Sequence, residues 1–134
     1  MFYFERNWDG SCKPPSAYPD QSLAVVTTHD LPTLTGYWSG EDIRLRARLG
    51  IYVHDQAVQQ ASYERALDKN HFLAALQGAG LLPPGVSAQQ ESVPAMTPEL
   101  CRAIHLYLAG SPAWVVMANL DYVIGEVTQM NLPG

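Results

Sequence analysis

The chain has 134 residues, of which 47% are hydrophobic and 16% charged, so it can bury a core and its length fits one domain. Its net charge of −5 argues against nucleic acid or an anionic membrane as the main partner, because both attract basic surfaces. No apolar run approaches the roughly 18 residues of a membrane span, and no signal peptide opens the chain, so we expect a cytoplasmic protein.

Apolar runs predict the strands. Residues 1–5 predict a short strand, and two near-continuous apolar runs follow at residues 23–28 and 113–118. Such runs are typical of parallel strands that are buried on both faces by helices. We therefore expect an α/β chain with about three short parallel strands.

The long connection between the two main runs has a helical pattern. Pro32 fits the first turn of a helix, Gly50 is a plausible stop, and Thr97 is a plausible N-cap before a first-turn proline. The predicted helices span residues 32–38, 41–49, 55–77, with a break near Asn70, and 97–109. Residues 31–112 are far more than an ordinary crossover needs, so we expect an inserted, mainly helical subdomain.

A His-Asp pair follows the first main apolar run. His29 and Asp30 would lie at the C-terminal end of that strand, where (β/α)₈ barrels build their active sites. Two other interpretations are open from local sequence. Asp30 could cap the next helix, or the pair could be half of a metal-dependent phosphohydrolase site. The second is disfavoured, because such pairs sit on helices among several further His and Asp ligands.

A longer motif surrounds this pair. Residues 27–38 read Thr-Thr-His-Asp-Leu-Pro-Thr-Leu-Thr-Gly-Tyr-Trp, and the segment resembles the signature of the amylomaltases, which are 4-α-glucanotransferases or disproportionating enzymes. Residues 2–6 and 120–134 also resemble the family, in the right order, so the resemblance covers essentially the whole chain. One departure is Tyr122, where the family usually carries an acidic residue.

The resemblance implies a fold that is larger than this chain. A (β/α)₈ TIM barrel alone takes about 250 residues, so we expect a C-terminal fragment of such a barrel. Residues 1–30 would then form barrel strands and a loop, residues 31–112 the helical insertion, and residues 113–134 the last strand and its loop. The family's nucleophilic Asp and acid/base Glu lie on earlier strands and have no counterpart here.

The resemblance also implies roles for individual residues. Asp30 would stabilise the transition state, and His29 would bind a neighbouring hydroxyl of the same sugar. Four further residues are candidates for substrate binding, although a core position or ordinary loop hydrogen bonding is an open alternative for each: Trp38, Glu126, Gln129 and Asn131. No metal or cofactor is implied. Cys12 and Cys101 lack metal-ligand spacing, and we expect both to be reduced.

The implied activity is transfer of α-1,4-glucan segments to glucose or another α-glucan by a retaining double displacement. The expected partners are α-1,4-glucans, maltooligosaccharides and glucose. We expect the isolated chain to be inactive and to self-associate through exposed strand edges. A non-catalytic helical domain that binds carbohydrate or another protein is the alternative.

Overall fold

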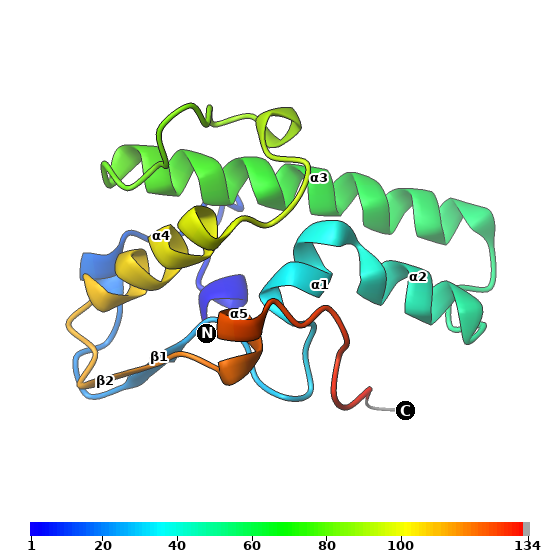
Figure 1. Ribbon diagram of the computed structural model, residues 1–134, viewed down its shortest axis with the longest axis horizontal. Coiled ribbons are helices and arrows are strands. Elements are labelled where there is room, and N and C mark those ends of the chain that lie inside the picture. The colour runs from blue at the N-terminus through cyan, green and yellow to red at the C-terminus, as the bar shows by residue number, and fades with distance from the viewer. Residues whose placement is uncertain (133–134) are drawn as a thin grey trace.

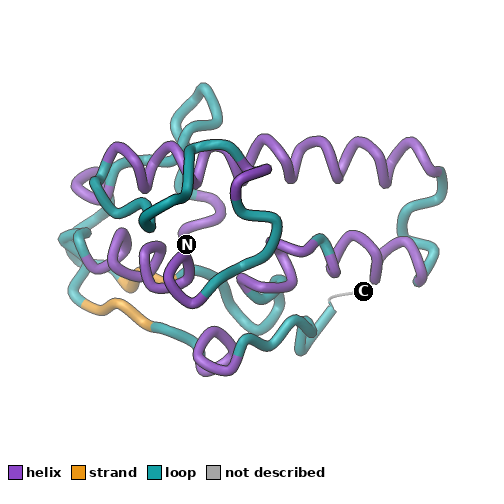
Figure 2. Tube along the Cα trace, turned by 45° about the horizontal axis from the view of Figure 1, so that its top comes forward, coloured by secondary structure: helices purple, strands orange, loops and turns teal. Residues whose placement is uncertain are grey.

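The computed structural model describes residues 1–132, so Pro133 and Gly134, which belong to the motif of the last loop, lie outside the described residues. Figure 1 shows a helical layer beside a small sheet, and Figure 2 shows how little of the chain is strand. The elements are η1 (Phe2–Phe4), η2 (Pro15–Ala17), β1 (Leu23–Val25), α1 (Leu34–Ser39), α2 (Glu41–Arg48), α3 (Asp55–Gly78), η3 (Gln90–Ser92), α4 (Pro98–Ala109), β2 (Val115–Met117) and α5 (Leu120–Ile124).

The two strands pair in parallel, as the apolar runs predict. Leu23 is opposite Val115, and the register continues to Val25 opposite Met117. Both strands are shorter than the runs that predict them, with three residues each. Because the strands are parallel neighbours, the segments that follow them leave the sheet at the same edge.

The strand predicted at residues 1–5 is wrong, because this segment forms the 3₁₀ turn η1. The amide groups of Phe4 and Glu5 both donate to the carbonyl of Met1, so they are not available to a neighbouring strand. The ring of Phe2 stacks on Phe72 of α3 with ring centroids 4.6 Å apart. Within residues 1–132 the sheet therefore has two strands instead of about three.

The helices follow their sequence signals closely. The hydroxyl of Thr33 accepts the amide of Gly36 and caps α1, and the hydroxyl of Thr97 accepts the amide of Leu100 and caps α4. Gly40 and Gly50, which follow α1 and α2, have positive φ angles of 76° and 71°. The break expected near Asn70 is wrong, because α3 is continuous over 24 residues. The Asn70 side chain instead accepts the amide of Gln90, outside the helix.

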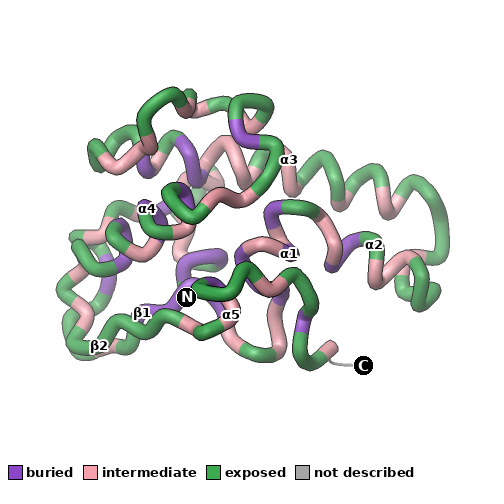
Figure 3. Tube along the Cα trace, in the orientation of Figure 1, coloured by how far each residue is buried: buried purple, intermediate pink, exposed green. Residues whose placement is uncertain are grey.

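The core lies between α3, α4, α1 and the N-terminal segment. Its fully buried side chains include aromatic and aliphatic groups from all four elements: Phe2, Leu34, Trp38, Phe72, Leu73, Leu76, Leu100, Ile104 and Leu108. Figure 3 shows these buried stretches facing one another, whereas the first half of α3 extends beyond them and is largely exposed. That half of the helix packs on α2.

The second strand is not buried, contrary to the prediction. Ala24 and Val25 of β1 are buried, but all three residues of β2 are exposed. Exposed apolar side chains continue from β2 into the next helix, and we call them the β2–α5 apolar face: Trp114, Val115, Val116, Met117, Leu120, Val123 and Ile124. The segment predicted as a loop after β2 contains α5, which ends at Gly125 with a φ of 70°.

Candidate active site

The His-Asp pair stands in an exposed turn after β1. The Nε2 atom of His29 lies 3.3 Å from Oδ1 of Asp30, and the two side chains are 76% and 44% exposed. The turn is closed by the amide of Leu31, which donates to the carbonyl of Thr28. Asp30 does not cap α1, because Thr33 performs that role. The capping interpretation of Asp30 is therefore wrong, and its carboxylate is open to solvent and to a ligand.

The segment after α5 folds back onto this turn. The amide nitrogen of Asn131 donates to Oδ1 of Asp30 at 2.5 Å, and the backbone amide of Asn131 donates to the carbonyl of His29 at 3.2 Å. The side-chain amide of Gln129 donates to two carbonyls, that of Asp30 at 2.9 Å and that of Asn131 at 2.8 Å. Four of the residues singled out in the sequence thus meet at one place.

Glu126 anchors the segment after α5 to α1 through its backbone carbonyl. Its carbonyl accepts the hydroxyl of Thr33 at 2.7 Å, which ties the start of the segment to α1. Its carboxylate accepts the amides of Thr128 and Val127, and these hydrogen bonds, chiefly that from Thr128, lower the pKa of Glu126. The Glu126 side chain therefore stabilises the backbone of its own loop.

Trp38 does not belong to this site. The side chain is fully buried, and its indole N–H donates to the carbonyl of Val93 at 2.8 Å. A buried indole with its donor satisfied is a core residue and cannot stack on a sugar in this structure. The substrate-binding prediction for Trp38 is wrong because its position on the inner face of α1 places it against the core.

A second polar network, which no local sequence pattern predicts, lies on the other side of α1. The guanidinium of Arg65 binds both carboxylate oxygens of Asp42, at 2.8 and 2.7 Å, and lies 3.4 Å from the centroid of the Tyr37 ring. Burial, the largest single influence, would lower the pKa of Arg65, but the hydrogen bond to Asp42 and the electrostatic effects of Tyr37 and Asp42 together outweigh it, and the pKa is raised. Tyr37 donates to Asp68, which also pairs with Arg6 at 3.1 Å.

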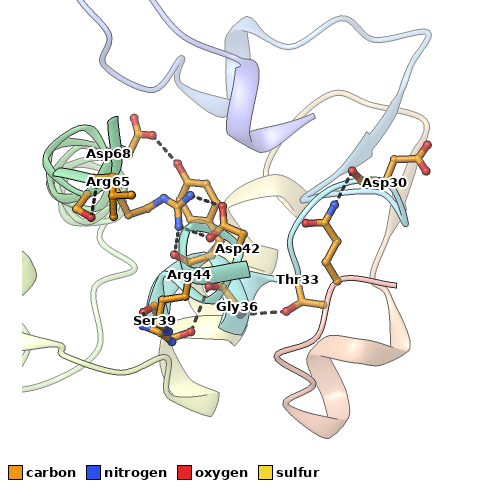
Figure 4. A network of polar contacts seen from close by, with 12 residues as sticks. Asp30, Thr33, Gly36, Ser39, Asp42, Arg44, Arg65 and Asp68 are labelled. Carbon is orange, nitrogen blue, oxygen red and sulfur yellow. Dashed lines mark hydrogen bonds and ion pairs between the residues drawn. The ribbon is translucent and has the colours of Figure 1, made fainter. Parts of the chain in front are cut away.

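This network borders the turn that carries Asp30. Figure 4 shows Asp30 and Thr33 on one side of α1, and Arg65 and Asp68 on the other. A cleft of about 330 Å³ is lined by the network and by Leu31 and Pro32, the two residues after Asp30. The network therefore joins α2 to α3 and shares this cleft with the base of the turn.

A comparison with known families decides which proteins this chain is related to. Residues 1–134 match the family model described as 4-alpha-glucanotransferase, which is the whole chain. The chain belongs to the 4-alpha-glucanotransferase family. The resemblance of residues 27–38 to amylomaltases is confirmed.

Named relatives agree with this assignment. The chain is 32% identical over 133 residues to a 4-alpha-glucanotransferase of Haemophilus influenzae, with 99% of this chain and 18% of the relative covered. A 4-alpha-glucanotransferase of Mycobacterium bovis is 30% identical over 138 residues, covering 100% of this chain and 18% of the relative. The crystal structure of amylomaltase from Corynebacterium glutamicum matches with a TM-score of 0.83 and 30% identity, over 99% of this chain and 19% of that one.

The described residues have three further properties. Among residues 1–132, no three His, Cys, Asp or Glu side chains are grouped so that they could hold a metal ion. Within the same range, no helix is both long and apolar enough to cross a membrane. Cys12 is buried and Cys101 is partly buried, and both are free cysteines. Burial raises the pKa of Cys12 to about 11, which disfavours its reactive thiolate.

Proposed function

We propose that this chain is the last part of the catalytic barrel of a 4-α-glucanotransferase. The intact enzyme would transfer α-1,4-glucan segments to glucose or to another α-glucan, with maltooligosaccharides as substrates and products. The observation that carries this proposal is the meeting of Asn131 and Gln129 with the exposed His29–Asp30 pair at the end of β1. The chain spans 18% of the curated relatives that it matches, so the activity is proposed for a longer protein.

The exposure of β2 supports the barrel. A parallel pair of strands with one exposed member is unusual for an isolated domain, because parallel strands are normally covered on both faces. The β2–α5 apolar face offers unpaired strand edge and apolar side chains together. In a closed (β/α)₈ barrel, β2 would pair with a further strand, and the ends of both strands would face the active site.

Asp30 would act on the charge that develops in the sugar. Glucan transfer with retention passes through an oxocarbenium-like transition state, in which positive charge appears at C1 and the ring oxygen. The nucleophile and the acid/base would come from earlier strands. The Asp30 carboxylate would grip ring hydroxyls in the distorted geometry, which binds the transition state more tightly than the ground state. His29 would bind a neighbouring hydroxyl and keep the ring in register.

A disproportionation assay tests the proposed function. Maltotriose is incubated with the 134-residue chain and, separately, with the longer protein that includes the preceding barrel strands. We expect glucose and longer maltooligosaccharides from the longer protein and none from the short chain. Activity of the short chain alone would require a nucleophile within it and would overturn the assignment of roles. Inactivity of both would favour a non-catalytic domain that binds carbohydrate or protein.

A further inference from the structure

The two oxygens of the Asp30 carboxylate have different surroundings. Oδ1 accepts the side-chain amide of Asn131, and Nε2 of His29 lies 3.3 Å from the same oxygen. Among residues 1–132, no protein group donates a hydrogen bond to Oδ2. The Asp30 side chain is 44% exposed, so the free oxygen is accessible. The protein therefore holds Oδ1 by contacts with Asn131 and His29 and leaves Oδ2 without a donor among the described residues.

Asn131 is itself held in place by this turn. Its backbone N–H donates to the carbonyl of His29, and its own carbonyl accepts the side chain of Gln129. The same Gln129 amide also donates to the carbonyl of Asp30. Gln129 is 9% exposed, so it forms a buried bridge between the two segments. The backbone of Asn131 is thus fixed relative to the residues that it contacts.

We propose that Asn131 is a positioning residue that fixes the rotamer of Asp30 and leaves Oδ2 to meet the sugar hydroxyls. This inference rests on the proposed function. A carboxylate in a solvent-exposed turn rotates about two side-chain bonds, and only some of its orientations bring an oxygen to the substrate. A hydrogen bond between an amide donor and a carboxylate is stronger than one between neutral groups, so it selects one orientation.

Within residues 1–132, the hydrogen bonds of Asn131 all lead to the turn that carries Asp30. One N–H of its side-chain amide donates to Asp30, its backbone N–H donates to His29 and its carbonyl accepts from Gln129. In this proposal Asn131 acts on the reaction through Asp30, and the double variant below tests that against direct contact with the sugar. Misplacing a group by about 1 Å can cost roughly 100-fold in rate, so a loss of positioning should appear in kcat.

The test is steady-state disproportionation of maltotriose by the complete enzyme that carries this segment. Asn131→Ala removes the donor, and Asn131→Asp keeps the shape but places a second acceptor against Oδ1. We expect both to lower kcat roughly 10- to 100-fold with KM changed less than about 2-fold. Met130→Ala is the matched control, because Met130 is the adjacent residue, is 71% exposed and has no side-chain hydrogen bond to any residue of 1–132.

A double variant distinguishes positioning from other roles. If Asn131 acts through Asp30, Asp30→Asn combined with Asn131→Ala should be no slower than Asp30→Asn alone. Additive losses, a raised KM with unchanged kcat, or wild-type kinetics of Asn131→Ala would each overturn the inference. The proposed function is judged separately, and it fails if the complete unsubstituted enzyme does not disproportionate maltotriose. Wild-type kinetics of Asp30→Asn would refute the role of Asp30 and the inference with it, whereas loss in Asp30→Asn with no effect of Asn131→Ala removes the inference alone.

Discussion

Gly36 of α1 packs against the backbone carbonyl of Val127. A Cβ atom at Gly36 would lie far closer than 3.0 Å to that oxygen, a separation that real side chains do not adopt. The contact lies next to the hydrogen bond between Thr33 and the carbonyl of Glu126. Together they bring residues 126–131 onto the His29–Asp30 turn. The φ angle of Gly36 is not positive, so its backbone conformation does not require glycine. Glycine is required here because the Val127 carbonyl approaches so closely.

Gly36→Ala should therefore loosen the site. The added methyl must push residues 126–131 away from α1 or strain the helix, which we expect to cost about 1–3 kcal/mol of stability. Transfer activity of the longer protein should fall as well, because Asn131 would move away from Asp30. Denaturant unfolding and maltotriose kinetics measure the two effects.

The matched control for this change is Gly78→Ala at the end of α3. A Cβ there would meet nothing within 4 Å, so the substitution should leave stability unchanged or raise it by up to about 1 kcal/mol. Equal changes in stability for the two substitutions would show that the close approach of Val127 to Gly36 does not constrain the fold.

The ion pair between Arg65 and Asp42 should contribute more to the free energy of unfolding than the surface ion pairs. The two side chains are 11% and 3% exposed, so Arg65→Ala leaves a buried carboxylate without its partner. We expect a loss of about 3–5 kcal/mol in the free energy of unfolding. Arg48→Ala, which breaks a pair with Glu41 in which Arg48 is 62% exposed, should cost at most about 1 kcal/mol.

A double substitution tests whether the loss arises from the unpaired charge. Replacing both Arg65 and Asp42 by apolar residues of similar size should restore much of the stability, since no charge is then left buried. Urea unfolding of the three variants decides the point. A double variant as unstable as Arg65→Ala would show that packing of the guanidinium on Tyr37 carries the effect.

The β2–α5 apolar face should make the isolated chain associate. Exposed strand edges and apolar patches both favour pairing with another copy. Light scattering at rising concentration should detect dimers or larger species, and Val115→Lys in β2 should shift them towards monomer. Tyr63→Lys is the control, because Tyr63 is 61% exposed on α3, outside this face. A monodisperse monomer at high concentration would contradict the prediction.

Local signals in the sequence predicted most of the elements. β1 follows from an apolar run, and α4 follows from Thr97, Pro98 and the spacing of its apolar residues. The turn with His29 and Asp30 was found because a strand, a polar pair and a helix start stand in direct succession. These features depend on neighbouring residues and need no knowledge of the rest of the chain.

What sequence reasoning missed depends on distant contacts. The packing of aromatic side chains on sugars predicts a place for Trp38 in the site, but its depth is set by contacts with residues far along the chain. The pairing of Arg65 with Asp42 has no local spacing that would reveal it. The exposure of β2 could not be predicted either, because an apolar run is the same whether or not its covering layer is present.

The central claim is that the Asp30 carboxylate stabilises the transition state, and one substitution tests it most directly. Asp30→Asn keeps the shape of the side chain and removes its charge. In the longer protein we predict normal folding by circular dichroism and a loss of maltotriose turnover of roughly 10²–10³-fold, about 3–4 kcal/mol. Wild-type turnover in that variant would contradict the account.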